Sequence, residues 1–527
     1  MTMSRPMSRP MSRPMSRRTV LKAAGVAGGA GLTLGMSSCG LDASPGQTAE
    51  PLRSSAPLPK PYAVPLPVPP VKRPVRTADG IDYYRVVQQR GSLEILPGLR
   101  TEVLGYDGLF PGPTFDVRSG RTIVVEQVNQ LDVPTVVHLH GGHTPSSSDG
   151  WPLDLLMPNG TSHHDHGMSG MPEMTGGDVK TGSRTYTYPN AQRAATLWYH
   201  DHRMDYTAPQ VYRGLFGLHL VRDAEEDALP LPGGDREIPL VIADRAFAAD
   251  GSFLYPARKD GPGVESAYME GVVGDVILVN GAPWPVLEVD AARYRFRILN
   301  ASNARRYELA LQPGPAKLVQ IGSDGGLLGA PVEHSSLVVA PAERFDVVVD
   351  FSAYQVGTEV TLVNRLGDGS AAQVMRFKVA RKASDDSSIP ARLSSYAEVP
   401  EPAGVVRRQW RFSRGSAGGH QGWTINGKPF DPSRMDARPR LDEYEVWTFV
   451  TDVHHPVHVH LAPFQVLRRG AGKAGQYDAG WKDTVDIRPA EVVDVLVRFS
   501  NYKGKYLIHC HNLEHEDMAM MAAFETT

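Results

Sequence analysis

The sequence has 527 residues and a formal net charge of −3, with 55 Lys and Arg against 58 Asp and Glu. At roughly 100–200 residues per domain, this length predicts about three domains. The balanced charge argues against nucleic acid or an anionic membrane surface as a partner and favours small molecules. With 52 glycines, 43 prolines and 8% aromatic residues, the chain favours short strands and turns, so we expect an all-β fold.

The first 43 residues are typical of an export leader. Ser16-Arg17-Arg18 precedes a weakly apolar run over residues 23–36, which resembles a twin-arginine signal. This run is shorter than the roughly 20 residues that span a bilayer. Residues 36–40 resemble a lipoprotein cleavage site, so lipidation of Cys39 and simple cleavage both stay open. We expect an exported protein that is extracellular, periplasmic or tethered by lipid at the cell surface.

Residues 44–77 form a proline-rich segment between the leader and the first domain. Its composition favours extended polyproline II structure. It could serve as a semi-rigid linker, or it could pack along the first domain as an ordered arm.

Three later stretches share one layout, in which an alternating strand, a polar turn and a second alternating strand follow one another. They are residues 122–140, 293–311 and 444–460. Alternation is typical of half-buried strands, and recurrence at long spacing indicates repeated domains. We therefore predict three Greek-key β-sandwich domains at residues 78–222, 236–382 and 404–527. In the second domain Leu309 and Leu311 match His138 and His140 of the first, so we expect it to be a spacer without metal ligands.

Histidines gather in four short clusters that hold ten of the 18 in the chain. The members are His138, His140, His200, His202, His455, His458, His460, His509, His511 and His515. Side chains alternate faces along a strand, so each His-x-His pair points both rings to one side, as neighbouring metal ions require. Two clusters lie in the first domain and two in the last, which predicts a site at their interface.

Cys510 lies between His509 and His511 and therefore faces the opposite side of its strand. His515 and Met520 follow at short spacing. A thiolate with imidazoles and a distant thioether is the ligand set of a blue, electron-transferring copper. The tripeptide thus predicts a covalent junction between two metal sites, through which electrons pass along a few bonds.

In their order, these clusters resemble those of multicopper oxidases, and the resemblance runs from about residue 78 to the end. The motifs LWYHDH, SDGWP, HCHNLEHED and MMAAF are most similar to three-domain bacterial spore-coat laccases and to bilirubin oxidases. The resemblance implies cupredoxin-like domains and four copper ions, one of type 1, one of type 2 and two of type 3. It implies His455, Cys510, His515 and axial Met520 at type 1, His138 and His458 at type 2, and His140, His200, His202, His460, His509 and His511 at type 3.

The implied reaction takes single electrons from a small-molecule reductant at type 1 copper and reduces O₂ to water at the other three. Proton delivery needs a carboxylate relay. Asp149 and Glu516 match acidic positions that this family uses for it, although Asp149 could instead only make a turn and Glu516 only a local pair. We expect a monomer that oxidises phenols and other electron-rich aromatics, as laccases do.

Other functions stay open. Residues 157–174 cluster His163, His164, His166 and several methionines, which suit Cu(I), so a Cu(I) or Mn(II) metallo-oxidase is one alternative and an incidental surface loop is another. A bilirubin oxidase is a second alternative, but Val453 stands where fungal bilirubin oxidases carry Trp. A non-enzymatic scaffold would not need to keep every ligand. We expect structural or surface roles for the remaining histidines, His143, His219, His334, His420 and His454.

Overall fold

The structure is a computed structural model that describes residues 49–160, 177–259, 261–417 and 420–527. The predicted leader lies outside the described residues, and so do residues 161–176 of the His- and Met-rich segment. The described chain is built of β-sheets, which confirms the all-β prediction. Its α-helices are short: α1 (Thr207–Arg213), α2 (Ala224–Asp227) and α3 (Leu513–Asp517). The 3-10 helices are η2 (Ser146–Ser148), η3 (Gly234–Arg236), η4 (Ser266–Tyr268), η5 (Phe351–Ala353) and η6 (Gly369–Ala372).

The first pair of sheets encloses one apolar core, to which both sheets contribute. In β10, alternate residues are exposed and buried, as in a strand with one face on the core. One sheet contains β2 (Arg76–Ala78), β3 (Ile81–Leu93), β4 (Thr101–Tyr106), β6 (Ile123–Asn129) and β10 (Ser183–Tyr188). The other contains β5 (Phe115–Arg118), β7 (Val137–His140), β11 (Ala195–Asp201) and β12 (Phe216–Arg222).

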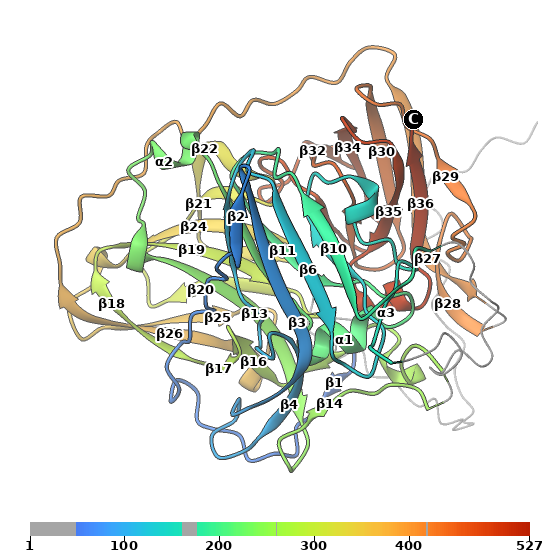
Figure 1. Ribbon diagram of the computed structural model, residues 1–527. Helices are drawn as coiled ribbons and strands as arrows, with labels where there is room; N and C mark the ends of the chain where they lie inside the picture. Colours follow the sequence, from blue (N-terminus) through green and yellow to red (C-terminus); the bar gives the residue numbers. More distant parts are fainter. Residues whose placement is uncertain (1–48, 161–176, 260, 418–419) are drawn as a thin grey trace, which may run out of the picture. The chain divides into compact units, whose positions relative to one another are not determined.

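A second pair of sheets spans residues 237–382 (Figure 1). Its long strand β13 (Glu237–Phe247) is buried over almost its whole length and pairs with β16 (Val276–Val279) on one edge and β19 (Arg293–Asn300) on the other. One sheet holds β13 (Glu237–Phe247), β14 (Phe253–Leu254), β16 (Val276–Val279), β17 (Ala282–Pro283), β19 (Arg293–Asn300), β21 (Leu318–Ser323), β22 (Gly326–His334) and β24 (Arg344–Asp350). The other holds β18 (Val286–Ala291), β20 (Tyr307–Gln312), β23 (Leu337–Val339), β25 (Glu359–Asn364) and β26 (Gln373–Lys382).

A third pair spans residues 406–526 and has its own core, which includes Cys510 and Met520. One sheet holds β27 (Val406–Ala417), β28 (His420–Ile425), β30 (Tyr444–Thr451), β32 (Phe464–Arg469) and β34 (Val492–Arg498). The other holds β29 (Met435–Ala437), β31 (His455–Val459), β33 (Thr484–Ile487), β35 (Gly504–Cys510) and β36 (Met521–Thr526). A long irregular segment between β26 and β27 connects this pair to the second (Figure 1).

The proline-rich segment, where described, lies against the folded sheets as an extended arm. Its strand β1 (Pro51–Leu52) pairs with β15 (Val273–Gly274). Further along, Leu66 N donates to Val286 O at 2.9 Å and Lys72 N to Thr114 O at 2.8 Å. The segment is therefore an ordered arm, but it lies along residues 273–286 of the second domain as well as along the first, to which the sequence alternative had assigned it. The remaining small sheet joins β8 (Leu156–Met157) to β9 (Lys180–Thr181).

Strand register brings the histidine clusters together. In the first pair of sheets, His200 on β11 lies opposite His138 on β7. In the third, His458 on β31 lies opposite His509 on β35, and Val457 lies opposite Cys510. Paired residues share a face of the sheet, so Cys510 lies on the opposite face from His509, as alternation predicts. No helix in the described ranges is long and apolar enough to cross a membrane.

Candidate metal centre

The face of β35 that carries Cys510 meets two imidazoles. Cys510 Sγ lies 3.4 Å from His455 Nδ1 and 3.7 Å from His515 Nδ1, and the two Nδ1 atoms lie 3.2 Å apart. All three side chains are buried. Burial raises the pKa of the Cys510 thiol well above its usual range, so only a bound cation would favour the thiolate here. One sulfur and two imidazole nitrogens that converge in a dry site fit the soft donor set of a blue copper.

The turn after Cys510 carries the other predicted ligands of this group. Asn512 caps α3, and its side chain accepts a hydrogen bond from His515 N at 3.4 Å. Cys510 N donates to Met520 O at 3.1 Å, and Met520 N donates to His515 O at 3.0 Å. Met520 is fully buried in the same core as Cys510. The backbone thus brings Met520 next to Cys510, as the predicted axial role requires.

The opposite face of β35 belongs to a second, larger group. We call it the eight-histidine cluster, and its members are His138, His140, His200, His202, His458, His460, His509 and His511. All are at most 1% exposed. The rings of His138 and His460 stack with centroids 3.9 Å apart, and those of His140 and His458 at 3.6 Å. His509 Nε2 lies 3.2 Å from His460 Nε2 and 3.4 Å from His202 Nε2.

Hydrogen bonds on the outer side fix several of these rings. His458 Nδ1 donates to Asp483 O at 2.8 Å, and His200 Nδ1 donates to Asp201 O at 2.8 Å. His140 is held the other way round, with Nε2 donating to Asp483 Oδ1 at 3.0 Å. Such outer partners orient metal-binding imidazoles and set which nitrogen is free.

The inner nitrogens are free, buried and close together. Those without a hydrogen-bond partner include Nε2 of His138, His200 and His458, Nδ1 of His140 and both ring nitrogens of His511. Buried polar atoms in folded proteins nearly always have a partner. Groups of three ligand atoms within 4.8 Å of one another occur at several points of the cluster, including His202, His460 and His509. The donor set therefore fits bound metal ions, and imidazole suits copper.

Burial also favours the neutral form of His200 and His202. It lowers the pKa of His200 to about 3 and that of His202 to about 4, with a further contribution from neighbouring imidazoles. A histidine must be neutral to bind a metal. These two histidines are therefore in the binding form at neutral pH.

The two predicted relay carboxylates contact the cluster from different sides. Asp149 Oδ2 lies 2.7 Å from His460 Nδ1. Glu516 Oε2 lies 3.1 Å from His509 Nδ1, and its Oε1 lies 3.5 Å from His202 Nδ1. Burial raises the pKa of Asp149 well above its usual range. Burial alone would also raise the pKa of Glu516, but His202 and His509 outweigh it and hold that pKa at about 2.

Sequence reasoning missed several contacting residues. Asp483 binds two cluster histidines and lies in Lys482-Asp483-Thr484, where no histidine or cysteine draws attention. Trp423 stacks on His515 with centroids 3.8 Å apart, and Asp452 Oδ1 accepts from His455 Nε2 at 3.0 Å. Motif spacing could not have found these residues.

The histidines set aside from the sequence, where their side chains are described, belong to neither group. His219 Nε2 contacts Asn190 Oδ1 at 3.1 Å, and His334 Nε2 contacts Gln320 Oε1 at 3.0 Å. His454 is next to His455 in sequence but is not part of the Cys510 group. His163, His164 and His166 lie outside the described residues.

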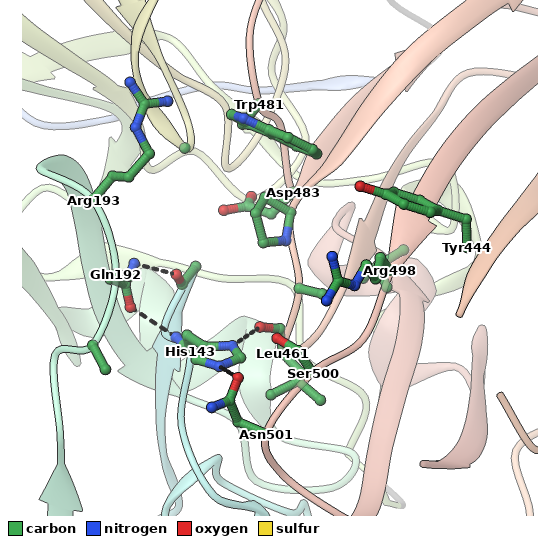
Figure 2. A pocket seen from close by; sticks show the side chains of 16 residues that line it. His143, Gln192, Arg193, Tyr444, Leu461, Trp481, Asp483, Arg498, Ser500 and Asn501 are labelled. Atoms are coloured by element: carbon green, nitrogen blue, oxygen red, sulfur yellow. Dashed lines mark hydrogen bonds between the residues drawn. The ribbon is translucent and has the colours of Figure 1, made fainter. Parts of the chain in front are cut away.

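A cavity of about 420 Å³ is lined by residues of all three pairs of sheets, and none of the cluster histidines is part of its lining. Asp483 and Gly141, the residue after His140, are part of its wall. Figure 2 shows Arg193 and Arg498 with the rings of Trp481 and Tyr444 around it. A second cavity, of about 370 Å³, lies beside the Cys510 group and is lined by Trp423, Glu270 and Arg414 among others.

Comparison with known proteins agrees with this geometry. Two family models described as multicopper oxidase match residues 88–166 and 154–226, and residues 407–527. A laccase of Bacillus subtilis is 35% identical over 518 residues, which cover 88% of this chain and 98% of that protein. The chain belongs to the multicopper oxidase family. It is a copper-dependent oxidoreductase that uses a reducing substrate and O₂.

Other multicopper oxidases are similarly related. A bilirubin oxidase of Albifimbria verrucaria is 36% identical over 501 residues, which cover 88% of this chain and 81% of that protein. The crystal structure of a laccase from Pediococcus acidilactici matches with a TM-score of 0.78 and 31% identity over 90% of this chain and 96% of that one. The predictions of family, enzyme class and cupredoxin-like fold are confirmed, whereas the role of each ligand stays a prediction.

Proposed function

We propose that this multicopper oxidase is a laccase-like enzyme that oxidises phenols and other electron-rich aromatics and holds four copper ions. The Cys510 group with Met520 would hold the type 1 copper. His138 and His458 would hold the type 2 copper, and the other six cluster histidines the type 3 pair. The observation that carries this proposal is the convergence of both donor sets on opposite faces of β35.

When bound, copper supplies one-electron oxidation of the donor at type 1 and the four-electron reduction of O₂ to two waters at the other three sites. Four donor molecules each lose one electron, and four protons are consumed. The chain joins the two groups through the backbone from His509 to His511. With copper bound at both groups, this backbone would give electrons a covalent path between them.

Asp149 and Glu516 supply complementary proton chemistry. Two carboxyl groups whose environments push their pKa values apart are typical of an acid and a base. The raised pKa of Asp149 favours its protonated form, which can give up a proton beside His460. The low pKa of Glu516 keeps it ionised beside His509, where it would hold a proton only transiently and pass it on.

The cavity beside Trp423 supports an aromatic donor. Trp423 connects its wall to His515 by ring stacking. Glu270 pairs with Arg414 through Oε1, while its buried Oε2 has no hydrogen-bond partner. That oxygen can accept the hydroxyl or amine hydrogen of a phenol or aromatic amine as the donor loses its electron.

A substrate panel on the copper-loaded protein tests this proposal. It compares a phenol, bilirubin, Cu(I) and Mn(II) at equal concentration under air. We expect the phenol to have the highest kcat/KM. An enzyme that binds copper but oxidises only metal ions would contradict the laccase-like assignment.

The metallo-oxidase alternative is motivated by the segment 157–174, most of which lies outside the described residues. The same panel, repeated on a variant that lacks this segment, separates the two functions. Loss of Cu(I) oxidation alone would favour the metallo-oxidase. Unchanged rates would exclude a role of the segment in docking Cu(I).

Bilirubin oxidase activity has one specific argument against it, which is Val453 in place of Trp two residues before His455, the proposed type 1 ligand.

We also propose export of a monomer by the twin-arginine pathway, on the pattern of residues 16–36. Replacing Arg17 and Arg18 by Lys should retain the precursor in the cytoplasm, as fractionation would measure.

A further inference from the structure

The segment Trp481–Thr484, which leads into β33, is held by the middle pair of sheets. Ser323 Oγ donates to Trp481 O at 2.8 Å, and Gly325 N donates to the same oxygen at 2.7 Å. Asp324 Oδ2 accepts from Asp483 N at 3.2 Å and from Thr484 N at 3.3 Å. A part of the chain without cluster histidines thus fixes the backbone on which Asp483 lies.

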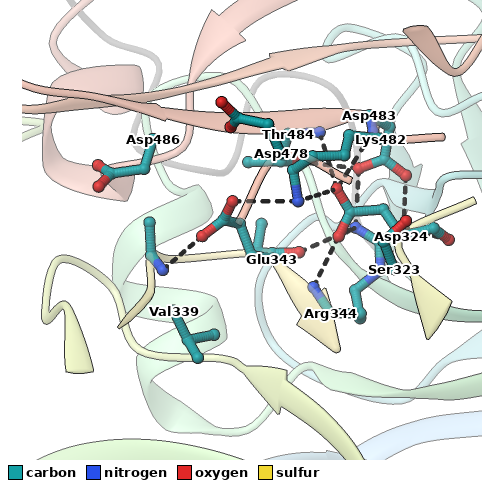
Figure 3. A network of polar contacts seen from close by, with 12 residues as sticks. Ser323, Asp324, Val339, Glu343, Arg344, Asp478, Lys482, Asp483, Thr484 and Asp486 are labelled. Carbon is teal, nitrogen blue, oxygen red and sulfur yellow. Dashed lines mark hydrogen bonds and ion pairs between the residues drawn. The ribbon is translucent and has the colours of Figure 1, made fainter. Parts of the chain in front are cut away.

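Arg344, the first residue of β24, holds the Asp483 side chain (Figure 3). Its Nη1 donates to Asp483 Oδ1 at 2.7 Å, and its Nη2 donates to Asp483 Oδ2. A guanidinium that binds both oxygens of a carboxylate fixes its plane as well as its charge. Arg344 and Asp483 are both buried, at 0% and 3% exposure, so water does not compete for this pair.

The same guanidinium contacts all three pairs of sheets. Arg344 Nε donates to Thr196 O on β11 at 2.9 Å, and Nη1 also donates to Ala342 O at 2.9 Å. Asp324 Oδ1 accepts from Arg344 N at 2.7 Å. The two side-chain bonds restrain the position of the guanidinium, and the backbone bond fixes the residue that carries it. Arg344 is therefore a fixed point at the junction of the three pairs of sheets.

Asp483 passes this restraint to two cluster histidines from different pairs of sheets. Its carboxylate accepts from His140 Nε2, and its backbone carbonyl accepts from His458 Nδ1. The chain just after His140 also packs on the pair, because a Cβ added at Gly141 would lie 2.7 Å from Asp483 Oδ2 and 2.8 Å from Arg344 Nη2. The free nitrogens of His140 and His458 face the cluster as a result.

We infer that Arg344 is a positioning residue for copper binding at His140, and that it acts through the carboxylate of Asp483. The middle domain is then part of the oxygen-reducing site and not merely a spacer. This inference rests on the proposed function, because it needs copper at the eight-histidine cluster. It assigns no ligand role to Arg344, whose side chain does not contact a cluster histidine through any hydrogen bond described here.

Matched variants of two buried arginines test the inference. Arg344→Lys keeps the charge but loses the two-pronged bond, and Arg344→Met loses both. Arg295 is the control, because it lies in the same sheet, is 3% exposed and binds Asp346 and Glu226 but not Asp483. Copper content and the type 2 signal in electron paramagnetic resonance are measured for each variant, together with the blue absorbance of the type 1 copper.

Loss of an outer partner typically weakens metal binding by about 10–100-fold. We expect up to that loss for copper at the eight-histidine cluster, where His140 is a proposed type 3 ligand, in Arg344→Met, a smaller one in Arg344→Lys, and unchanged blue absorbance in both. Arg295→Lys and Arg295→Met should keep wild-type copper affinity. Combining Arg344→Met with Asp483→Asn should weaken copper binding no further than Asp483→Asn alone, because both changes remove one path.

Wild-type copper affinity at the cluster in both Arg344 variants would overturn the inference, and so would an equal loss in the Arg295 variants. If Arg344→Met does not fold, Arg344→Lys still decides the question. A wild-type protein that binds no copper at the cluster would instead refute the proposed function. The two failures are therefore distinguishable.

Discussion

Glu516→Gln is the sharpest test of the oxygen-reducing site. The substitution keeps the shape of a side chain that is 1% exposed and lies 3.1 Å from His509 Nδ1. It removes the negative charge and the basic oxygen. Copper ligands are left in place, so a fall in rate would report on proton transfer.

The expected size of the effect is that of a positioned proton-transfer group. Burial raises the pKa of Glu516, but His202 and His509 hold it at about 2, so Glu516 is ionised in the neutral range and would carry a proton only transiently, as a relay. A positioned acid or base contributes about 10²–10⁴-fold to a proton-transfer rate. We expect reoxidation of the reduced enzyme by O₂ to slow by about that factor.

Stopped-flow spectroscopy separates the two half-reactions. Anaerobic bleaching of the blue colour by a phenol should keep its wild-type rate, and only the return of the colour with O₂ should slow. Glu514→Gln is the control on the same helix, because Glu514 is equally buried but accepts from Asn303 Nδ2 at 2.7 Å and Val272 N at 3.0 Å. Reoxidation of Glu516→Gln at the wild-type rate, or an equal slowing in Glu514→Gln, would refute the relay.

Three further changes have defined outcomes. Cys510→Ser should remove the blue absorbance and all donor oxidation, and turnover that survives would refute the electron route through β35. Burial lowers the pKa of His219 from 6.5 to about 3, so as the pH falls the unfolded chain binds a proton on this residue before the folded protein does. The free energy of unfolding should therefore fall by about 1.4 kcal/mol per pH unit between about pH 6.5 and pH 3. In His219→Gln without copper, the free energy of unfolding measured with denaturant should fall by about 2 kcal/mol less than in the wild type between pH 6.5 and 5. Trp423→Ala should lower the free energy of unfolding by about 3–5 kcal/mol. It should also shift the blue absorbance, because His515 loses its stacked ring. An unchanged spectrum would show that Trp423 does not position His515.

The two groups of candidate ligands could be predicted from the sequence because strand alternation is a local property. His509, Cys510 and His511 lie on one strand, and their faces follow from the period of two. The register of β31 against β35 then agrees with the separation of the two groups. The same pattern gave the all-β fold, since each half-buried strand carries its own periodicity.

The outer supports could not be predicted in that way. Asp483 and His140 are 343 residues apart, and Asp483 and Arg344 are 139 apart. No spacing rule connects such residues, because their contact depends on how separate sheets pack. For the same reason the middle domain was expected to act only as a spacer, although Arg344 and Asp324 contact the segment that carries Asp483.

The folding free energy that the cluster costs argues that it has a function. A buried polar atom without a partner costs about 1–3 kcal/mol, and several imidazole nitrogens of the eight-histidine cluster are in that position. Their combined cost is comparable with the 5–15 kcal/mol of net stability that proteins usually have. Selection for stability alone would replace such nitrogens by apolar groups, whereas a cation bound between them turns each into a ligand. The middle domain takes part in this arrangement, because the guanidinium of Arg344 holds Asp483, and Asp483 in turn bonds His140 Nε2 and leaves His140 Nδ1 free toward the cluster.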